Sequence, residues 1–304
     1  YDVVVIGGMN TDYLVKGERL PCGETLEGEV FQESSGGRGG NQAVAVSRLG
    51  CRAALIGRIG ADDRGTRLLD HVSAEGVDVT YVRRDANADT GAALIMVNRS
   101  GDKQSLWAPG ANHRLTEADV EAAKGAIAGS KVLLAQLEVP VPAVALALRL
   151  AKAAGLRTVL DPAPALPLTE DVLRLVDVLR PNASEAATLT GFPVQDRTGA
   201  ARAARALLDR GSGAVVVQAG KSGNLLVTSS EERFLPRIPV ESVDSTGAGD
   251  AFAAGLAVGL AEGRPLAEAA AMGSAAAALA TTKLGAQPAM PRREEVLRLV
   301  ASMS

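Results

Sequence analysis

The chain has 304 residues, of which 47% are hydrophobic and 22% are charged, so it can bury a core of ordinary size for a globular protein. Aromatic residues make up only 3%, and we therefore expect the core to consist mainly of Ala, Val and Leu. A formal net charge of −3 argues against binding to nucleic acid, whose backbone is normally recognised by a surplus of Lys and Arg.

Cysteine and histidine are too few to suggest a disulfide framework or a zinc centre. Cys22 and Cys51 lack the CxxC spacing of a metal or redox pair, and the histidines are His71 and His113. The most membrane-like stretch, residues 269–280, is shorter than the ~20 residues of a membrane span and predicts a buried helix. No basic segment followed by a longer apolar run precedes the first apolar stretch. We therefore expect no signal peptide, no membrane partner and a cytoplasmic protein.

Short β-branched runs alternate along the chain with longer helical segments. The runs predict strands at residues 3–6, 53–59, 132–136, 158–161, 178–180 and 214–218. Helices are predicted at residues 42–49, 65–75, 141–154, 200–209, 247–261, 266–282 and 292–301. Strands that are apolar on both faces and alternate with helices are typical of a mainly parallel sheet covered on both sides.

Two segments, residues 13–35 and 90–107, interrupt this alternation. Each contains a stretch with period-two patterning and no helix between its strands. We expect antiparallel strands that stand outside the main sheet and pair with each other. A small sheet of this kind needs a cover for its apolar face, which a substrate, the main domain or a second subunit would supply.

Two glycine-rich segments resemble nucleotide-binding motifs but fail on spacing. Gly220-Lys221-Ser222 could end a P-loop, yet Val215 stands where that motif needs Gly, and a strand rather than a helix follows. Residues 36–41 could form a dinucleotide fingerprint, yet Gln42 takes the place of its third glycine and no strand ends immediately before it. The sequence therefore argues against a P-loop and against an NAD-dependent dehydrogenase.

Residues 244–250 carry a stronger signal, because they lead into a helix of small residues that is expected to begin near Ala251. The backbone N–H groups of Gly247, Ala248 and Gly249 would then lie at a helix N-terminus, which attracts anions. A carboxylate there, that of Asp250, could take a proton from a hydroxyl that attacks a bound phosphoryl group. A glycine-rich helix entry with a dipole-compensating Asp is the alternative.

Polar side chains also follow several predicted strands, at the end of an open α/β sheet where ligands bind. They are Asn10, Asp12, Gln136, Glu138, Asn182 and Glu185. Carboxylates and amides of this kind suit a polyhydroxylated ligand beside an anion site. Asp12 could instead be a turn residue and Glu138 a solvated strand end. Asn182 and Glu185 also have the spacing of a helix capping box.

Both glycine-rich segments occur together with further motifs. These are Asn10-Thr11-Asp12, residues 21–25, residues 41–45, Gln136-Leu137-Glu138, residues 161–164 and residues 285–288. In this combination the sequence resembles the ribokinase-like sugar kinase family from about residue 3 to residue 295. The resemblance implies one domain over residues 1–304, folded as a three-layer α/β/α sandwich with a mainly parallel central sheet. It also implies a small β-sheet lid, from residues 13–35 and 90–107, through which a homodimer forms.

The resemblance further implies ATP-dependent phosphorylation of the 5-hydroxyl of ribose, with Asp250 as general base and the amides of Gly247, Ala248 and Gly249 as an anion hole. The sugar would contact Asn10, Asp12, Gly37, Arg38, Gly39, Gly40, Asn41, Glu138 and Asp250. ATP would contact Asn182, Glu185, Gln218, Ala219, Gly220, Lys221, Ser222, Gly223, Gly249 and Ser274. Glu185 would order Mg²⁺ through water. A potassium ion would lie at Asp244, Thr246, Ala280, Lys283 and Gly285.

Three positions depart from the pattern of that family. Arg38 stands where many members carry Lys, and Ser274 stands where an Asn often lies near the adenine. Ala289 replaces a Ser that typically binds the potassium ion, which predicts a weakened cation site. A kinase of the same family for fructose, 2-keto-3-deoxygluconate or a nucleoside is an alternative. A non-catalytic sugar- or nucleotide-binding regulator is another, but the presence of Asp250 and the glycines before it argues against that class.

Overall fold

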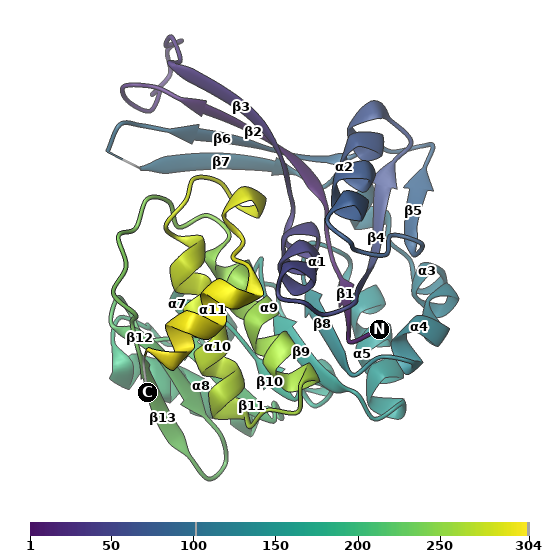
Figure 1. The fold of residues 1–304 in the computed structure, drawn as a ribbon, viewed down its shortest axis with the longest axis vertical. Coiled ribbons are helices and arrows are strands. Elements are labelled where there is room, and N and C mark those ends of the chain that lie inside the picture. The colour runs from purple at the N-terminus through teal and green to yellow at the C-terminus, as the bar shows by residue number, and fades with distance from the viewer. Residues whose placement is uncertain (101, 303–304) are drawn as a thin grey trace.

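A computed structural model of the chain describes residues 1–100 and 102–302, so position 101 of the predicted segment 90–107 lies outside the described residues. Within these ranges the strands form a nine-stranded and a four-stranded sheet (Figure 1). The order of the large sheet is β13-β12-β11-β10-β9-β8-β1-β4-β5. Its strands are β1 (Val3–Ile6), β4 (Ala53–Gly60), β5 (Val82–Asp85), β8 (Val132–Gln136), β9 (Arg157–Asp161), β10 (Val178–Leu179), β11 (Ala214–Gln218), β12 (Gly223–Val227) and β13 (Glu232–Pro236). The neighbours from β4 across to β11 pair in parallel, and β12 is antiparallel to both of its neighbours.

Helices cover both faces of the large sheet. One face carries α1 (Arg38–Arg48), α2 (Asp63–Ala74), α9 (Ala248–Ala261), α10 (Leu266–Ala280) and α11 (Arg293–Ala301). The other face carries α3 (Glu117–Ala122), α4 (Lys124–Ala128), α5 (Val141–Ala153), α6 (Glu170–Leu173), α7 (Ala183–Thr190) and α8 (Arg197–Asp209). Two short 3₁₀ helices, η1 (Gly110–Arg114) and η2 (Gln287–Ala289), lie in connecting segments. The predicted three-layer α/β/α sandwich is confirmed, and every helix and strand of the central domain predicted from the sequence is present.

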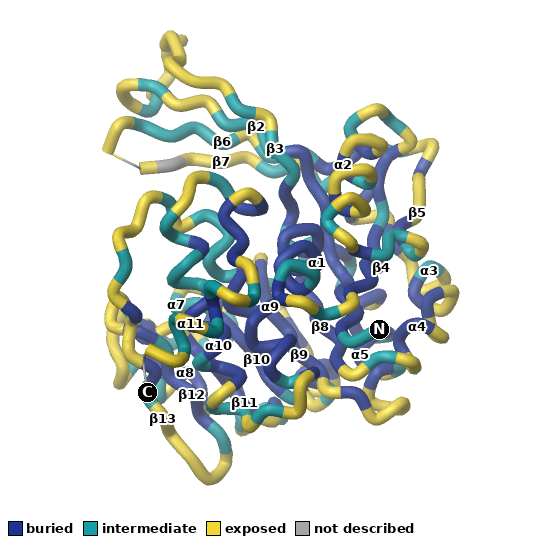
Figure 2. The backbone as a smooth tube through the Cα atoms, in the orientation of Figure 1, coloured by how far each residue is buried: buried dark blue, intermediate teal, exposed yellow. Residues whose placement is uncertain are grey.

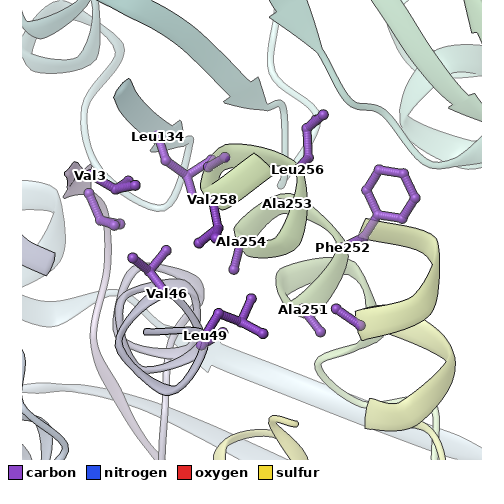
Figure 3. Close-up of a cluster of buried hydrophobic side chains, with 14 of the residues drawn as sticks. Val3, Val46, Leu49, Leu134, Ala251, Phe252, Ala253, Ala254, Leu256 and Val258 are labelled. Atoms are coloured by element: carbon purple, nitrogen blue, oxygen red, sulfur yellow. The ribbon is translucent and has the colours of Figure 1, made fainter. Parts of the chain in front are cut away.

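The core is aliphatic, as the composition predicts. Alternate residues of the central strand β1 point to opposite faces, so Val3 packs with the α1–α9 layer and Val4 with the α5 layer. Figure 3 shows the first of these clusters, where Val46 of α1 and Leu49, directly after α1, meet the small residues of α9. Burial of a Val or Leu side chain in this cluster contributes about 1.5–3 kcal/mol to the free energy of unfolding. Figure 2 shows the central sheet and α9 as a continuous buried region.

Helices α9 and α10 approach each other closely because glycines stand at their contact. A Cβ atom on Gly255 would lie 2.9 Å from the Cα of Gly273, and one on Gly259 would lie 2.7 Å from the Cα of Ala269. Larger side chains would push the helices apart. None of the helices in the described ranges combines the length and apolar character that a membrane crossing requires. The predicted buried helix at residues 269–280 is part of α10.

The small sheet consists of β2 (Asn10–Lys16), β3 (Val30–Gly36), β6 (Gly91–Val97) and β7 (Lys103–Ala108), in the order β3-β2-β6-β7. We call these four strands the lid. The two predicted segments do pair with each other, but β2 and β6 are parallel, so the prediction of antiparallel strands was wrong at that pair. The physical reason is the path of the chain. After β3 it passes through α1, β4, α2 and β5, and it re-enters the lid from the end where β2 begins (Figure 1).

The lid strands have two different faces, as period-two alternation requires. Asp12 pairs in register with Ala93, which pairs with Trp107, and all three line a cavity beneath the lid. The next row consists of Tyr13, Leu94 and Leu106, on the opposite face. Leu94 is 55% exposed and Leu106 is 73% exposed, and Figure 2 shows this part of the lid as half-buried and exposed. One face of the lid therefore serves the cavity while the other presents apolar side chains to solvent.

Candidate active site

A cavity of about 940 Å³ lies between the lid and the carboxyl-terminal ends of the central strands. Asn10 follows β1, Glu138 follows β8, and Arg180 and Asn182 follow β10, and all four side chains line it. The lid contributes Trp107 among others. This is the edge of an open α/β sheet at which ligands are expected to bind.

Helix α1 begins directly against the chain that follows β1. Gly37 precedes it with φ +83°, and a Cβ atom there would lie 2.6 Å from the Cα of Met9. A Cβ atom on Gly39 would lie 2.5 Å from the carbonyl carbon of Gly7. This close approach brings Gly37, Arg38 and Asn41 to the cavity wall, whereas Gly39 and Gly40 lie behind it in backbone contacts.

Asp250 lies in the first turn of α9, which begins at Ala248 rather than near Ala251. Its carboxylate is 4% exposed and accepts two hydrogen bonds, from Nδ2 of Asn41 at 2.9 Å and from Nε2 of Gln42 at 3.1 Å. The predicted anion-site residues Gly247, Ala248 and Gly249 line the cavity beside it. The carboxylate is thus held in one orientation at the positive end of a helix.

Arg38 stands at the centre of a group of carboxylates. Its guanidinium lies 3.4 Å from Asp161, 3.7 Å from Asp250 and 3.9 Å from Glu185, and its backbone N–H donates to Oε2 of Glu138 at 2.8 Å. Burial opposes the positive charge, but the surrounding carboxylates outweigh that penalty and hold the pKa of Arg38 above its ordinary value. Arg38 therefore offsets negative charge that would otherwise accumulate around Asp250.

Gln42, Gln136 and Asp161 form a hydrogen-bonded group next to the Asp250 carboxylate. The side-chain amide of Gln42 donates to Asp250 and also to Oδ2 of Asp161 at 2.9 Å, and its oxygen accepts from Gln136. Burial raises the pKa of Asp161, although the charges of Arg38 and Arg180 act against that rise. Sequence reasoning gave Gln42 and Asp161 no role, although both lie in the motifs that it singled out.

A second hydrogen-bonded group fixes the lid end of the cavity. Oδ1 of Asn10 accepts from Nδ2 of Asn112 at 2.8 Å and from Nε1 of Trp107 at 3.2 Å. Asn112 is fully buried and also binds both backbone groups of Met9. Trp107, at the end of the predicted segment 90–107, lines the cavity. Its position on the same face of the lid as Asp12 is the signal that could have identified it.

Asp12 and Glu138 are two carboxylic acids that line the cavity. Burial, reinforced by the charge of Asp250, raises the pKa of Asp12 to about 7. Burial also raises the pKa of Glu138 to about 7, against the opposing effect of Arg38. Both carboxyls are therefore half-protonated near neutral pH and are suited to hydrogen bonds with hydroxyl groups.

The residues predicted to contact a nucleotide lie at the opposite end of the cavity. The cavity wall there is formed by Gln218, Gly220, Lys221, Gly223, Asn182 and Ser274. Ala219 and Ser222 lie behind this wall in the same turn, where the Ser222 hydroxyl donates to the carbonyl of Ala219 at 2.8 Å. A strand, β12, follows this turn, as expected for a segment that is not a P-loop. Ser274 Oγ is buried and has no hydrogen-bond partner among the described residues.

Asn182 and Glu185 form the predicted capping box at the start of α7. Oδ1 of Asn182 accepts from the backbone N–H of Glu185, and Oε2 of Glu185 accepts from the N–H of Asn182, both at 2.8 Å. Oε1 of Glu185 accepts from Nδ2 of Asn182 at 2.7 Å and lies 3.9 Å from the Arg38 guanidinium, yet each carboxylate oxygen can accept a second hydrogen bond. Capping and ligand binding are therefore compatible roles for this residue.

The residues predicted to hold a potassium ion surround the loop before α9. Oδ1 of Asp244 accepts from the N–H and hydroxyl of Thr246, and its Oδ2 accepts from the N–H of Gly285 at 2.9 Å. Ala280 is buried, and the Lys283 ammonium lies 3.7 Å from Glu295. Thr246 is the member of this set that lines the cavity. In the described part of the chain, no cluster of three or more His, Cys, Asp or Glu side chains could hold a metal ion by itself.

Comparisons with known proteins identify the family of this chain. The family model for "pfkB family carbohydrate kinase" matches residues 1–293. The chain is 38% identical to a ribokinase of Haemophilus influenzae over 98% of both chains, and 34% identical to a deoxyribokinase of Salmonella typhi over 83% of both. The solved structure of Arabidopsis thaliana ribokinase complexed with ribose and ATP superimposes with a TM-score of 0.89, at 32% identity and 98% coverage of both chains. The chain therefore belongs to the pfkB family of carbohydrate kinases.

Proposed function

We propose that this protein transfers the terminal phosphoryl group of ATP to the 5-hydroxyl of D-ribose. The observation that carries the proposal is the carboxylate of Asp250, held by Asn41 and Gln42 at the start of α9 and facing a polar cavity. The similarity to ribokinases, one of them solved with ribose and ATP, supports this choice of substrates. We place the reaction in the cytoplasm, where ATP is available.

The sugar end of the cavity offers a defined set of donors and acceptors. Because Oδ1 of Asn10 already accepts from Trp107 and Asn112, its Nδ2 is oriented to donate to a sugar hydroxyl. Asp12 and Glu138 accept hydrogen bonds from neighbouring hydroxyls. The backbone at Gly37 and the Arg38 side chain complete the wall.

Asp250 then accepts the proton of the attacking hydroxyl. The hydrogen bonds from Asn41 and Gln42 hold its carboxylate before the reaction, so no reorientation is needed during proton transfer. The amides of Gly247, Ala248 and Gly249 would face the charge that develops on the transferred phosphoryl group, for which Ala248 would give up its 3.3 Å hydrogen bond to the carbonyl of Ser245. The dipole of α9, which is positive at its N-terminus, also stabilises this negative charge.

The nucleotide would be held by Asn182, Ser274 and the turn from Gln218 to Gly223. The Ser274 hydroxyl has no hydrogen-bond partner in the described part of the chain, which fits a contact with a ligand. Glu185 would help to hold Mg²⁺ through water. A single carboxylate fits this ion, which in phosphoryl-transfer sites is bound largely by phosphate oxygens and water. When bound, the ion supplies charge neutralisation for the phosphates.

The exposed face of the lid supports a homodimer. Leu94, Leu106 and Phe31 present apolar surface there, and Phe31 stacks on Tyr13 with ring centroids 6.3 Å apart. Monomeric proteins rarely expose a contiguous apolar patch of this kind on a sheet. A second copy of the chain, with the same face of its lid, is the occupant that we propose.

The loop before α9 supports a weakened potassium site. The carboxylate of Asp244 accepts from the N–H groups of Thr246 and Gly285 and so holds together the two segments that the site requires. Ala289 is buried at η2 and supplies no side-chain oxygen. We therefore propose that potassium stimulates activity by fixing this loop, with one ligand fewer than in relatives that have Ser.

Replacement of the base tests the mechanism. Asp250→Asn keeps the shape of the side chain but cannot accept the proton, so kcat should fall about 10²- to 10⁴-fold. Nucleotide affinity, measured by calorimetry, should change little. Asp209→Asn, on the exposed surface of α8, is the matched control. A kcat of Asp250→Asn within threefold of the parent would refute Asp250 as the base.

Substrate identity is tested with Asp12→Asn and Glu138→Gln. Loss of a charged acceptor should raise the ribose KM about 10- to 150-fold and reduce discrimination against 2-deoxyribose. A panel of ribose, 2-deoxyribose, fructose, 2-keto-3-deoxygluconate and adenosine, with coupled ADP detection, measures both effects. If another member of the panel is the better substrate, and only its kinetics change in the variants, the ribose assignment fails in favour of a sister activity.

The same carboxyls predict a pH dependence of sugar binding. Since the pKa values of Asp12 and Glu138 are raised to about 7, both groups gain a proton as pH falls from 8 to 6 and become weaker acceptors. Ribose affinity measured by calorimetry without nucleotide should therefore be lower at pH 6 than at pH 8. The difference should shrink in Asp12→Asn. Equal affinity at both values in the parent would contradict this role.

The cation site is tested by titrating potassium against rate at constant ionic strength. Ala289→Ser restores one oxygen ligand, so half-maximal activation should occur at a lower potassium concentration than in the parent. Identical curves would show that Ala289 does not border a cation site. A rate that ignores potassium in both proteins would remove the site altogether.

The dimer is tested with the double variant Leu94→Lys, Leu106→Lys. Charges on the exposed face of the lid should prevent its burial, so the variant should have the mass of a monomer by light scattering where the parent has that of a dimer. Glu121→Lys, on the exposed side of α3, controls for the added charge. A monomeric parent would disprove the assembly.

A further inference from the structure

Arg180 has an environment that the assignments above do not explain. It follows β10, and its backbone N–H donates to the carbonyl of Leu160 at 2.9 Å. The residue is only 8% exposed, yet its Nε has no hydrogen-bond partner, and no carboxylate of the described chain lies within 4.0 Å of its guanidinium. Burial of a charge without a hydrogen-bonded partner is unfavourable, so such a group in a cavity wall indicates a partner that comes from outside the chain.

The guanidinium of Arg180 points at the first turn of α9. A Cβ atom on Gly249 would lie 3.0 Å from its Nη1 and 3.9 Å from Nη1 of Arg38, so both guanidinium groups flank the same glycine. Arg38 already has carboxylates at 3.4 to 3.9 Å, whereas Arg180 has none at such distances among the described residues. Of the two, Arg180 is thus the one whose charge is available to a ligand.

Phe252 holds this guanidinium in place. The Cζ atom of Arg180 lies 4.8 Å from the centroid of the Phe252 ring, and the ring is fully buried in the cluster that Figure 3 shows. A cation stacked on an aromatic ring is attracted to it without losing its hydrogen-bond donors. Because Phe252 is on the same helix as Asp250, α9 positions the arginine and the carboxylate together.

A planar guanidinium with free donors is suited to the oxygens of a phosphate group. We propose that Arg180 binds the phosphoryl group in transfer, beside the first turn of α9, an inference that rests on the proposed kinase function. In that step a bond forms from the sugar oxygen to the terminal phosphorus, and the bond from that phosphorus to the bridging oxygen of ADP breaks. The hydroxyl proton passes to Asp250, and Arg180 keeps its protons while it neutralises the charge on the phosphoryl oxygens.

The test compares Arg180→Met and Arg180→Lys with Arg202→Met. Arg202 is an exposed arginine whose guanidinium stacks on Phe192 at 3.9 Å, so it controls for loss of a stacked cation away from the cavity. Arg180→Met should lower kcat about 100- to 1,000-fold while ribose affinity, measured by calorimetry, stays within about twofold. Arg180→Lys should recover part of the rate, because it restores the charge without the planar donor pair. Arg202→Met should match the parent.

A measurement of nucleotide affinity tests the role of Arg180 without depending on catalytic turnover. Arg180→Met should weaken the affinity for the ATP analogue AMP-PNP about tenfold or more and leave ADP affinity unchanged, because only the former carries the terminal phosphoryl group. Equal effects on both nucleotides, or a kcat within threefold of the parent, would overturn the proposal. A parent that phosphorylates no sugar of the panel, with the AMP-PNP effect intact, would instead refute the proposed function and leave only the contact between Arg180 and the terminal phosphoryl group of the nucleotide.

Discussion

The site depends on the placement of one positive charge among several carboxylates. Arg38 enters the cavity from the first turn of α1 and lies within 4 Å of Asp161, Asp250 and Glu185. Without it, these groups would face one another at the ends of separate strands and helices, with only the more distant charge of Arg180 to oppose them. The convergence of α1, α7, β9 and α9 on this point is therefore an electrostatic requirement as much as a result of packing.

That placement depends in turn on backbone contacts that only small residues allow. Gly37 and Gly39 let α1 begin against the chain after β1, and the glycines between α9 and α10 set the position of the helix that carries Asp250. Gln42 then joins the two halves, because it bonds both Asp161 and Asp250. The Asp250 carboxylate is thus fixed by contacts that span more than 200 residues of sequence.

Much of this arrangement follows from local patterns in the sequence. The strands and helices of the central domain were predictable because β-branched runs and helical segments alternate, and the glycine-rich helix entries at Gly37 and Gly247 were recognisable from composition. The parallel pairing of β2 with β6 was not, because it depends on the route of the chain between them. Asn112 and Arg180 also escaped prediction, since their roles arise from neighbours that are distant in sequence.

The alternation of side chains in the lid has a consequence for how such a protein can change in evolution. Asp12 and Trp107 on one face are separated by a single position from Tyr13 and Leu106 on the other. Insertion or deletion of one residue within β6 or β7 would exchange the two faces beyond that point, placing leucines over the sugar and polar groups outside. A change in the length of one of these strands would therefore alter both the residues that face the cavity and those that face solvent. Specificity can drift there by substitution, but not by changes in strand length.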